Sequence, residues 1–409
     1  MSGLLPVAEA LARVLASVPG PVEAETVPLA RAAGRTLAAD VAALRTQPPF
    51  PASAMDGYAV RAADVASVPA ILRLIGTSAA GHGYSGPLAV GEAVRIFTGA
   101  PVPEGADAIL IQENAEADGA RVTALEPVEA GRFLRAAGLD FVQGDRLLRS
   151  GDGLDARRLA LAAAGGHPAL SVRRRPRVAV LATGDELVRP GEPARWDQIV
   201  ASNGLAVAAL AAEAGAEIID LDIAGDSHAA LDAAIAAARQ AEADLLVTLG
   251  GASVGDHDLV QAALRSAGMD LGFWRVELRP GKPLMHGRIG RMLVIGLPGN
   301  PVSAIVCGSL FVVPAVRALL GDPRAGADRS EPATLGRAMP ANDGRQDYMR
   351  ARLETAPDRV PVAHAETRQD SSMLSVLGAS EALLIRAPHA PAAEAGEPCR
   401  ILRLDRRIL

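Results

Sequence analysis

The sequence contains few cysteines and few aromatic residues. Two of its 409 residues are cysteines, Cys307 and Cys399, and aromatic residues make up 3%. Two cysteines cannot form a disulfide framework, and neither belongs to a Cys-x-x-Cys pair of the kind that binds zinc. This usage predicts a protein of the reducing cytoplasm.

A surplus of positive charge is also missing. The formal net charge is −6 at pH 7, and no basic tract is interleaved with aromatic residues. Such a chain has no general electrostatic attraction to nucleic acid, so we expect no nucleic-acid partner. The short basic tract at 173–177 is interpreted as an exposed linker.

One apolar run is long enough to span a bilayer, but its context favours a buried helix. Residues 301–320, PVSAIVCGSLFVVPAVRALL, directly follow a strand and a tight turn and contain Pro314 and Arg317. The N-terminal run carries Glu9 and Arg13, which predicts an amphipathic helix instead of a signal peptide. We therefore expect no membrane partner.

The patterns along the chain predict a multidomain α/β protein, at roughly 150 residues per domain. Residues 1–43 and 142–172 are rich in helical patterns, in particular LPVAEALARVLASV, VPLARAAGRTLAADVAAL and GLDARRLALAAAGG. Residues 44–141 contain short β-type runs broken by proline and glycine, which predicts an inserted β-rich domain. Alternating segments over residues 326–409 predict a small C-terminal β-domain.

Residues 173–325 alternate between strand and helix patterns. This order predicts a central, doubly wound α/β domain with a parallel sheet. Asn300 followed by Pro301 is typical of a helix start. The expected strands are 177–182, 217–223, 244–249 and 291–296, and the expected helices lie near 198–214, 227–241, 259–266 and 301–320.

Three of these strands lead into polar turns that contain glycine: RVAVLATGDEL, DLLVTLGGASVGDHD and RMLVIGLPGNPVS. Their uninterrupted apolar residues are typical of parallel strands buried on both faces. Backbone N–H groups and helix N-termini then converge on one sheet edge, which favours anion binding. The same turns carry Asp185, Glu186, Asp256 and Asp258, and carboxylates repel phosphate unless a divalent cation lies between them. The sequence therefore predicts a metal-assisted phosphate site.

Two further groups of residues are candidates for binding. Arg275, Arg279 and Lys282 lie within eight residues around a proline-containing turn, and beside an anion-binding edge they favour ligand contact over a solvated loop. Asp56 and Thr98 lie in turns of the β-rich domain, where ordinary turn chemistry is the default interpretation. No metal-ligand spacing joins His257 and His286, so neither is an expected ligand.

Six motifs occur in the order and rough spacing of the molybdopterin molybdenumtransferases, the MoeA-type enzymes related to the gephyrin E domain. They are SAMDGYAV, RIFTGAPVPEGADA, TGDEL, GGASVGDHD, RPGKPL and GLPGNPVS. The resemblance implies an elongated homodimer of four-domain subunits in which residues 173–325 form the molybdopterin-binding α/β domain. It further implies insertion of molybdate into adenylated molybdopterin, with release of AMP, formation of molybdenum cofactor and a requirement for Mg²⁺.

The resemblance also implies roles for individual residues. Catalytic roles fall on Asp56, Thr98, Asp140, Glu186, Asp226 and Asp258, and Mg²⁺ binding falls on Glu186, Asp226 and Asp258. Together with the glycine turns, it gives these substrate- and phosphate-binding residues: Thr183, Gly184, Gly250, Gly251, Ser253, Gly255, Arg275, Arg279, Lys282, Pro298, Gly299, Asn300, Arg350 and Ser371.

The chain departs from the family pattern at several of these places. Leu139 replaces a glutamate beside Asp140, and Arg275 and Arg279 stand where some relatives have lysines. Asp370 and Ser372 replace glycines that are common around Ser371.

Two alternative functions stay open at the level of sequence. A molybdopterin adenylyltransferase has a similar α/β domain, but usually that domain alone. A gephyrin-like scaffold would bind a peptide in a dimer groove, and nothing in the sequence marks such a groove. The family resemblance also implies contacts with molybdopterin adenylyltransferase and with apo-molybdoenzymes.

Overall fold

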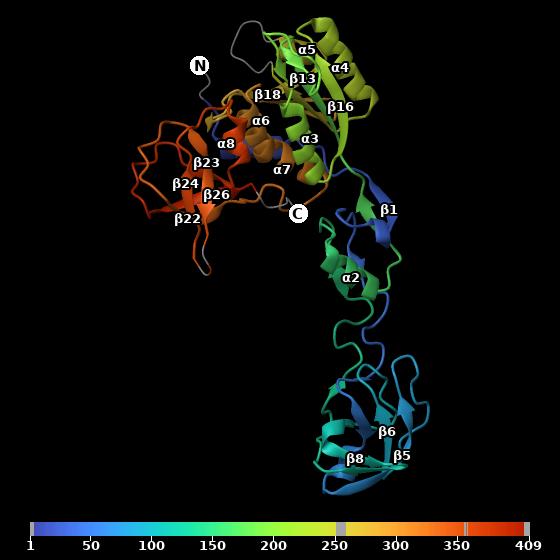
Figure 1. Cartoon of the computed structure of the whole chain (residues 1–409). Helices are drawn as coiled ribbons and strands as arrows, with labels where there is room; N and C mark the ends of the chain where they lie inside the picture. Colours follow the sequence, from blue (N-terminus) through green and yellow to red (C-terminus); the bar gives the residue numbers. More distant parts are fainter. Residues whose placement is uncertain (1–3, 251–258, 356, 358, 405–409) are drawn as a thin grey trace.

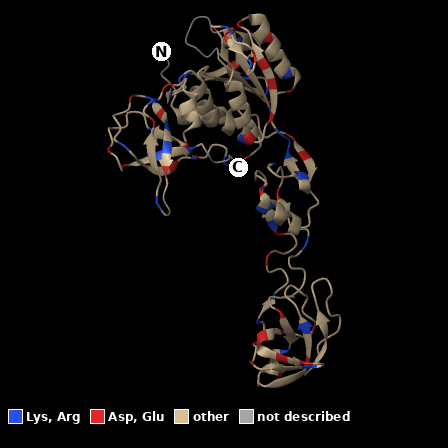
Figure 2. Cartoon of the chain, in the orientation of Figure 1, with Lys and Arg blue, Asp and Glu red and all other residues tan. Residues whose placement is uncertain are grey.

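The computed structural model describes residues 4–250, 259–355, 357 and 359–404. An α/β domain and a β-domain lie side by side, and an arm leads from them to a separate β-rich domain (Figure 1). Basic and acidic residues are interspersed in all of these parts (Figure 2). The predicted fold class, a multidomain α/β protein, agrees with this architecture.

The central sheet has six strands in the order β16-β13-β17-β21-β20-β18. The first four are parallel, as the alternation of strand and helix predicts. Antiparallel β20 and β18 extend one edge, and neither strand was predicted; the cationic turn recognised in the sequence lies between them. The strands are β16 (Glu217–Ala224), β13 (Arg177–Thr183), β17 (Leu245–Leu249), β21 (Met292–Leu297), β20 (Met285–Ile289) and β18 (Asp270–Trp274).

Helices cover both faces of this sheet because its central strands are apolar on both sides. Val178 and Val180 of β13 join one hydrophobic cluster, while Ala179 and Leu181 join the other. The first cluster contains side chains of α3 and of the helical run that begins at Pro301, and the second contains side chains of α4 and α5. The helices are α3 (Asn203–Glu213), α4 (His228–Gln240), α5 (Leu259–Ser266), α6 (Pro301–Cys307), the π-helical segment Gly308–Val312 and α7 (Val313–Leu319).

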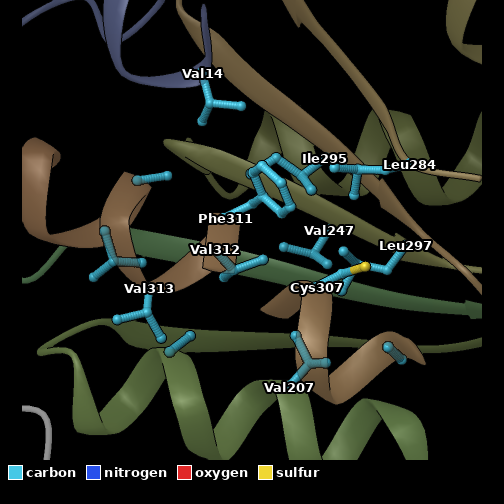
Figure 3. Close-up of a cluster of buried hydrophobic side chains, with 14 of the residues drawn as sticks. Val14, Val207, Val247, Leu284, Ile295, Leu297, Cys307, Phe311, Val312 and Val313 are labelled. Atoms are coloured by element: carbon cyan, nitrogen blue, oxygen red, sulfur yellow. The ribbon is translucent and has the colours of Figure 1, made fainter. Parts of the chain in front are cut away.

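The run from Pro301 to Leu319 is long and apolar enough to cross a membrane, but 78% of it is buried inside the protein. Phe311 and Cys307 are fully buried and lie among Val247, Ile295 and Leu297 of the sheet (Figure 3). The predicted buried helix is confirmed, although its middle turn is π-helical, a rare local widening of an α-helix.

Helix α1 (Val7–Ala16) packs on the α/β domain. Val7, Ala10 and Val14 are buried in the same cluster as the sheet, and Val14 lies above Phe311 in Figure 3. The sequence placed residues 1–43 in one domain with 142–172, so the position of α1 departs from that expectation. Its apolar stripe is covered by α7 instead.

The arm comprises residues 20–47 and 141–173. Its strands pair in two antiparallel ladders, and α2 packs on them. The helix predicted for VPLARAAGRTLAADVAAL is wrong: this segment contains a 3₁₀ turn, Leu29–Arg31, and buries Leu37 and Val41 against α2 in extended backbone. The elements are β1 (Ala24–Pro28), β12 (Ala169–Arg173), β2 (Val41–Ala42), β11 (Arg146–Leu148) and α2 (Ala156–Ala164).

The β-rich segment expected over residues 44–141 contains a six-stranded sheet in the order β7-β4-β6-β5-β9-β8 and the short pair β10-β3. Both connections to the arm run side by side (Figure 1). The elements are β3 (Ala52–Ser53), β4 (Gly57–Val60), a 3₁₀ turn (Ala62–Val65), β5 (Ala70–Ser78), β6 (Glu92–Ile96), β7 (Ala108–Ile111), a 3₁₀ turn (Gln112–Asn114), β8 (Ala115–Asp118), β9 (Arg121–Ala124) and β10 (Leu134–Arg135).

The C-terminal β-domain has a sheet in the order β19-β23-β24-β22-β26-β25, in which β23 also pairs with β25. Strand β19 comes from the α/β segment of the chain, so this sheet is joined to the α/β domain by shared backbone. The elements are β19 (Leu278–Arg279), β22 (Glu331–Leu335), β23 (Gln346–Glu354), β24 (Val362–Ala365), α8 (Leu374–Gly378), β25 (Ala382–Arg386) and β26 (Pro398–Arg403).

Candidate functional site

A cleft of about 670 Å³ lies at the carboxyl ends of β13, β17 and β21. The turn after each strand contributes to its wall: Thr183 and Gly184 after β13, Gly250 after β17, and residues 298–300 after β21. Parallel strands place their carboxyl ends on one edge, which is where open α/β sheets bind ligands. Three turns that are far apart in the sequence therefore line one cavity.

Three helices begin at this cleft. The first residue of each helix lines it: Asn203 of α3, Leu259 of α5 and Pro301 of α6. The first turn of a helix has backbone N–H groups without a partner in the helix, and the helix dipole adds partial positive charge there. In α6, Pro301 has no N–H and the Val302 N–H donates to the Ser371 carbonyl oxygen, so these two residues add no free donor. The arrangement favours an anionic ligand, above all a phosphate group.

The turns need glycine for steric reasons. Gly250 has φ +99°, and a Cβ atom there would lie 2.8 Å from the carbonyl oxygen of Thr183. The Thr183 hydroxyl donates a hydrogen bond to the carbonyl oxygen of Leu249, 3.2 Å away, which ties the ends of β13 and β17 together. Close approach of two backbones thus leaves the wall of the cleft free of side chains at Gly250.

Two carboxylates line the same cleft, those of Glu186 and Asp226. The Glu186 carboxylate folds back over Gly184, where a Cβ atom would lie 2.3 Å from Oε2. The Asp226 backbone N–H donates to Oδ1 of Asp185 at 3.0 Å, which fixes the turn before α4. Both Glu186 and Asp226 are exposed, so their oxygens face solvent at the anion-binding edge.

These oxygens fit a magnesium ion, because Mg²⁺ is usually held by one or two carboxylates together with substrate phosphates. Within the described parts of the chain, no group of three or more His, Cys, Asp or Glu side chains could hold a metal by itself. The third predicted ligand, Asp258, lies outside the described residues, as do Gly251, Ser253 and Gly255. The magnesium site stays a prediction that rests on Glu186 and Asp226.

The three predicted cations differ in their surroundings. Arg279 is held by acidic side chains, since its Nε donates to Asp347 Oδ1 at 2.7 Å and its Nη1 to Asp343 Oδ2 at 3.0 Å. The Arg275 guanidinium lies 4.8 Å from the centre of the Trp274 ring. Its Nε is buried and has no hydrogen-bond partner among the described residues. Lys282 is exposed and is followed directly by Pro283, which lines the cleft.

The C-terminal domain reaches the cleft through Ser371. The Asn300 side chain donates from Nδ2 to Ser371 Oγ at 2.9 Å, and the Val302 N–H donates to the Ser371 carbonyl oxygen at 3.0 Å. Arg350 is 1% exposed, and its Nη2 donates to the carbonyl oxygen of Asp370 at 2.9 Å. Burial lowers the pKa of Arg350 from its usual value, but an arginine stays cationic in proteins.

Asp56 and Thr98 form a pair in the β-rich domain. Oδ1 of Asp56 accepts hydrogen bonds from the Thr98 N–H at 2.7 Å and from the Thr98 hydroxyl at 2.8 Å. These two bonds lower the pKa of Asp56, so it is ionised at neutral pH. The pair lies beyond the arm from the cleft of its own chain (Figure 1). Asp140 is exposed where the β-rich domain meets the arm.

Several residues of the cleft wall were not predicted from the sequence, and Asn203 is the one among them that holds a neighbouring turn. Asn203 lines the cleft, and its Nδ2 donates to the Gly299 carbonyl oxygen at 2.6 Å, which holds the turn after β21. The helix was expected to begin near residue 198, but it begins at Asn203 after the short parallel pair β14 (Leu187–Val188) and β15 (Ile199–Val200). Ser202 before Asn203 is a common helix-start residue and could have indicated the correct position.

Family models match three successive parts of the chain. They are the "MoeA N-terminal region (domain I and II)" at residues 5–166, the "Probable molybdopterin binding domain" at 179–318 and the "MoeA C-terminal region (domain IV)" at 332–404. The chain belongs to the MoeA family. The cleft described above lies within the second of the three matched regions.

Relatives extend this finding over most of the chain. A molybdopterin molybdenumtransferase of Nostoc sp. is 40% identical over 73% of this chain and 70% of its own length. One of Haemophilus influenzae is 38% identical over 78% of each chain. The crystal structure of a MoeA protein from Pyrococcus horikoshii OT3 is 27% identical and superposes with a TM-score of 0.84 over 98% of this chain and 99% of its own.

Membership in the MoeA family confirms two expectations. The multidomain architecture, with a central α/β domain and a C-terminal β-domain, is that of the Pyrococcus horikoshii MoeA structure. The relatives are transferases by name, which confirms the prediction that this MoeA-family chain is an enzyme of that class.

Proposed function

We propose that this MoeA-family protein inserts molybdate into adenylated molybdopterin, with formation of molybdenum cofactor and release of AMP. The observation that carries the proposal is the cleft at the sheet edge, where three helix N-termini and three glycine-containing turns surround two carboxylates. Phosphate groups would bind at the helix N-termini of this wall, and a divalent cation would bind at its carboxylates. The names of the relatives indicate the same reaction class.

In this proposal the phosphates of the substrate bind to backbone amides of the cleft. The N-terminus of α3 at Asn203 supplies donors, and the turns at Gly184 and Gly250 keep the wall free of bulky side chains, although their own N–H groups donate to the carbonyl oxygens of Ala224 and Leu297. Such fixed donors hold the pyrophosphate link of the substrate and orient its reacting phosphorus. No nucleophilic side chain of the protein is required.

Glu186 and Asp226 would hold Mg²⁺ from one side, and the substrate phosphates would hold it from the other. Bound there, Mg²⁺ would supply positive charge that stabilises the phosphate group of AMP as it leaves. The protein residues fix where that charge lies, and the acidic turn before α4 is itself held by the hydrogen bond between Asp185 and the Asp226 N–H. Asp258 is the remaining predicted ligand.

Molybdate is an oxyanion, and the C-terminal domain offers donors for one beside the cleft. The Nε of Arg350 is buried and has no hydrogen-bond partner among the described residues, and its cationic side chain forms no ion pair with a described carboxylate within 4.0 Å. Ser371 Oγ accepts from Asn300, which leaves the Ser371 hydroxyl hydrogen to donate to a ligand. We assign Arg350 and Ser371 to the molybdate side of the site.

The Asp56–Thr98 pair lies too far along the arm to act on the cleft of its own chain, so the proposal includes a homodimer in which the second copy supplies it. Closed twofold dimers are the commonest soluble oligomers, and an elongated chain can place its distal domain over a partner. Each cleft would then be completed by residues of both copies. A cytoplasmic location and contacts with molybdopterin adenylyltransferase and apo-molybdoenzymes are part of the same proposal.

Reconstitution of an apo-molybdoenzyme tests the function. Purified protein is incubated with adenylated molybdopterin, molybdate and Mg²⁺, and the activity recovered by the apo-enzyme is measured. We expect recovery at low molybdate concentration, without ATP, and loss of recovery with excess EDTA. Consumption of ATP and molybdopterin would favour a molybdopterin adenylyltransferase, and failure to restore any molybdoenzyme would favour a scaffold.

A further inference from the structure

Arg279 makes four hydrogen bonds to the C-terminal domain. Its Nε donates to Asp347 Oδ1 at 2.7 Å, its Nη1 to Asp343 Oδ2 at 3.0 Å, and its Nη2 to Asn342 Oδ1 at 2.9 Å and to Asp347 Oδ2. A guanidinium has five N–H donors in a fixed fork. The protein thus occupies four of the five donors, which leaves one N–H group for a substrate phosphate.

Asp347, which accepts two of these hydrogen bonds, lies on a strand of the C-terminal sheet. Asp347 is 5% exposed and lies on β23, where it pairs in register with Arg279 of β19. The Gln346 N–H also donates to the Glu277 carbonyl oxygen at 2.9 Å. Asp347 raises the pKa of Arg279, in keeping with a close ion pair. Backbone pairing and side-chain pairing thus fix the same short segment to the C-terminal domain.

This segment leads directly into the turn that carries Lys282. Gly281 has φ +119° and packs on α6, since a Cβ atom there would lie 2.4 Å from the Cys307 sulfur. The Lys282 carbonyl oxygen accepts from the N–H groups of Val276 and Leu284, at 3.0 and 3.1 Å. The turn is therefore held at both ends, and the Lys282 side chain is exposed beside Pro283 in the cleft wall.

We propose that Arg279 and Asp347 form a positioning pair that aims Lys282 at the anionic substrates, and that Arg279 itself does not bind them. The inference rests on the proposed function and replaces one predicted role with another. An arginine suits this task because its fork bridges Asp347, Asp343 and Asn342 at once, whereas a lysine offers a single point charge. Lys282, with its compact mobile charge, remains the ligand.

A double-mutant cycle tests the pair. The variants are Arg279→Ala, Lys282→Ala and the double variant, with KM for molybdate, KM for adenylated molybdopterin and kcat measured for each. Displacement of Lys282 is expected to raise one or both KM values about 10- to 100-fold in either single variant, with a smaller change in kcat. The double variant should be no worse than Lys282→Ala, because Arg279 acts only through Lys282.

Two further variants separate positioning from direct binding. Arg279→Lys keeps the charge but not the fork, so it should behave like Arg279→Ala. Asp347→Asn keeps the shape but weakens the ion pair, so it should shift the same KM. Arg345→Ala is the matched control, since Arg345 also pairs with Asp343 at 3.0 Å but lies outside the turn, and it should leave KM unchanged. Thermal melting of each variant checks that the fold is intact.

The outcomes distinguish the inference from the proposed function. Additive effects of Arg279→Ala and Lys282→Ala, or wild-type KM values in Arg279→Lys, would overturn the positioning role and leave the proposed reaction standing. Wild-type kinetics in Lys282→Ala would overturn both the positioning role and the assignment of Lys282 to the site.

Discussion

The Asn300 side chain donates a 2.9 Å hydrogen bond to the hydroxyl oxygen of Ser371 and so joins the turn after β21 to the C-terminal domain. Asn300 directly precedes α6, at the position where a side-chain oxygen usually caps the helix, yet its side chain makes no capping bond. Its amide group serves the domain junction instead. The C-terminal domain therefore adjoins the cleft at Ser371, and binding of a ligand that contacts both will depend on their relative position.

This junction leads to a prediction for Ser371→Ala. Removal of the hydroxyl takes one donor from the oxyanion side of the proposed site, and a hydrogen bond to a charged group contributes about 1.5–3 kcal/mol. We expect KM for molybdate to rise about tenfold or more, with KM for adenylated molybdopterin nearly unchanged. Steady-state kinetics with each substrate varied in turn measure both values.

The control for Ser371→Ala is Ser372→Ala. The Ser372 hydroxyl donates to Asp370 Oδ1 at 2.6 Å within the exposed turn and has no assigned ligand role. It should leave both KM values close to those of the wild type. An equal loss in the two variants would mean that the turn, and not the Ser371 hydroxyl, is what matters.

A mixing experiment tests the shared site. Asp56→Ala and Asp226→Ala are each expected to be inactive, because one lacks the distal pair and the other a carboxylate of the cleft. In a mixed dimer, one site combines the intact cleft of one copy with the intact Asp56 of the other. Random exchange should therefore restore about one quarter of wild-type activity, since half of the dimers are mixed and one of their two sites is intact.

The same mixing experiment has a clear opposite result. If Asp56 acted on the cleft of its own chain, every chain in the mixture would carry one defect and no activity would return after exchange. A mixture of Asp226→Ala with Glu186→Ala, two changes in the same cleft, is the matched control. It should remain inactive because no combination of copies gives an intact cleft.

His286 gives the protein a predictable dependence on pH. It is 2% exposed, its Nδ1 lies 3.0 Å from the Val294 carbonyl oxygen, and its Nε2 lies 2.8 Å from Oγ of Ser17, the residue that follows α1. Burial, with a smaller contribution from Arg288, lowers its pKa from 6.5 to about 4. The folded protein therefore holds His286 neutral over a range in which the unfolded chain takes up a proton.

The sign follows from this difference. The stabilising effect of neutral His286 is fully present above pH 6.5 and is lost as pH falls from 6.5 toward 4. In that window it contributes a slope of about 1.4 kcal/mol per pH unit to the free energy of unfolding. Denaturant unfolding of His286→Gln at several pH values should show a slope smaller by this amount. A wild-type slope in His286→Gln would contradict this account of the pH dependence.

Gly250→Ala should damage the cleft and the fold together. The new Cβ would approach the Thr183 carbonyl oxygen to 2.8 Å at a backbone φ of +99°. Strain of this kind costs about 1–3 kcal/mol, and its relief would push the turns after β13 and β17 apart. Denaturant unfolding and KM for adenylated molybdopterin measure the two effects. Gly378→Ala, where a Cβ meets nothing within 4 Å, should be neutral in both assays.

Sequence patterns predicted the three inner parallel strands of the central sheet well because these strands are apolar almost without interruption. β13, β17 and β21 are buried on both faces, and a continuous apolar run of this length is typical of such strands. The helix expected after Val27 failed for a different reason. Its apolar residues satisfy a helical period, but pairing of β1 with β12 and packing on α2 determine the backbone there.

The candidate site could be predicted where its chemistry is local. The turn at Thr183–Gly184 and the helix start at Asn300–Pro301 can each be recognised from a few consecutive residues. The engagement of Arg279 could not be predicted in this way, because Asp347 lies 68 residues further along the chain. A cation in a sequence looks the same whether a ligand or a distant carboxylate will bind it.

The most direct test is the release of AMP from adenylated molybdopterin by the purified protein. One AMP should be released per molybdenum cofactor formed, only when molybdate and Mg²⁺ are both present, and Asp226→Ala should abolish the release. AMP release at the wild-type rate by Asp226→Ala, or in excess EDTA, would contradict the role given to the cleft at the carboxyl ends of the sheet.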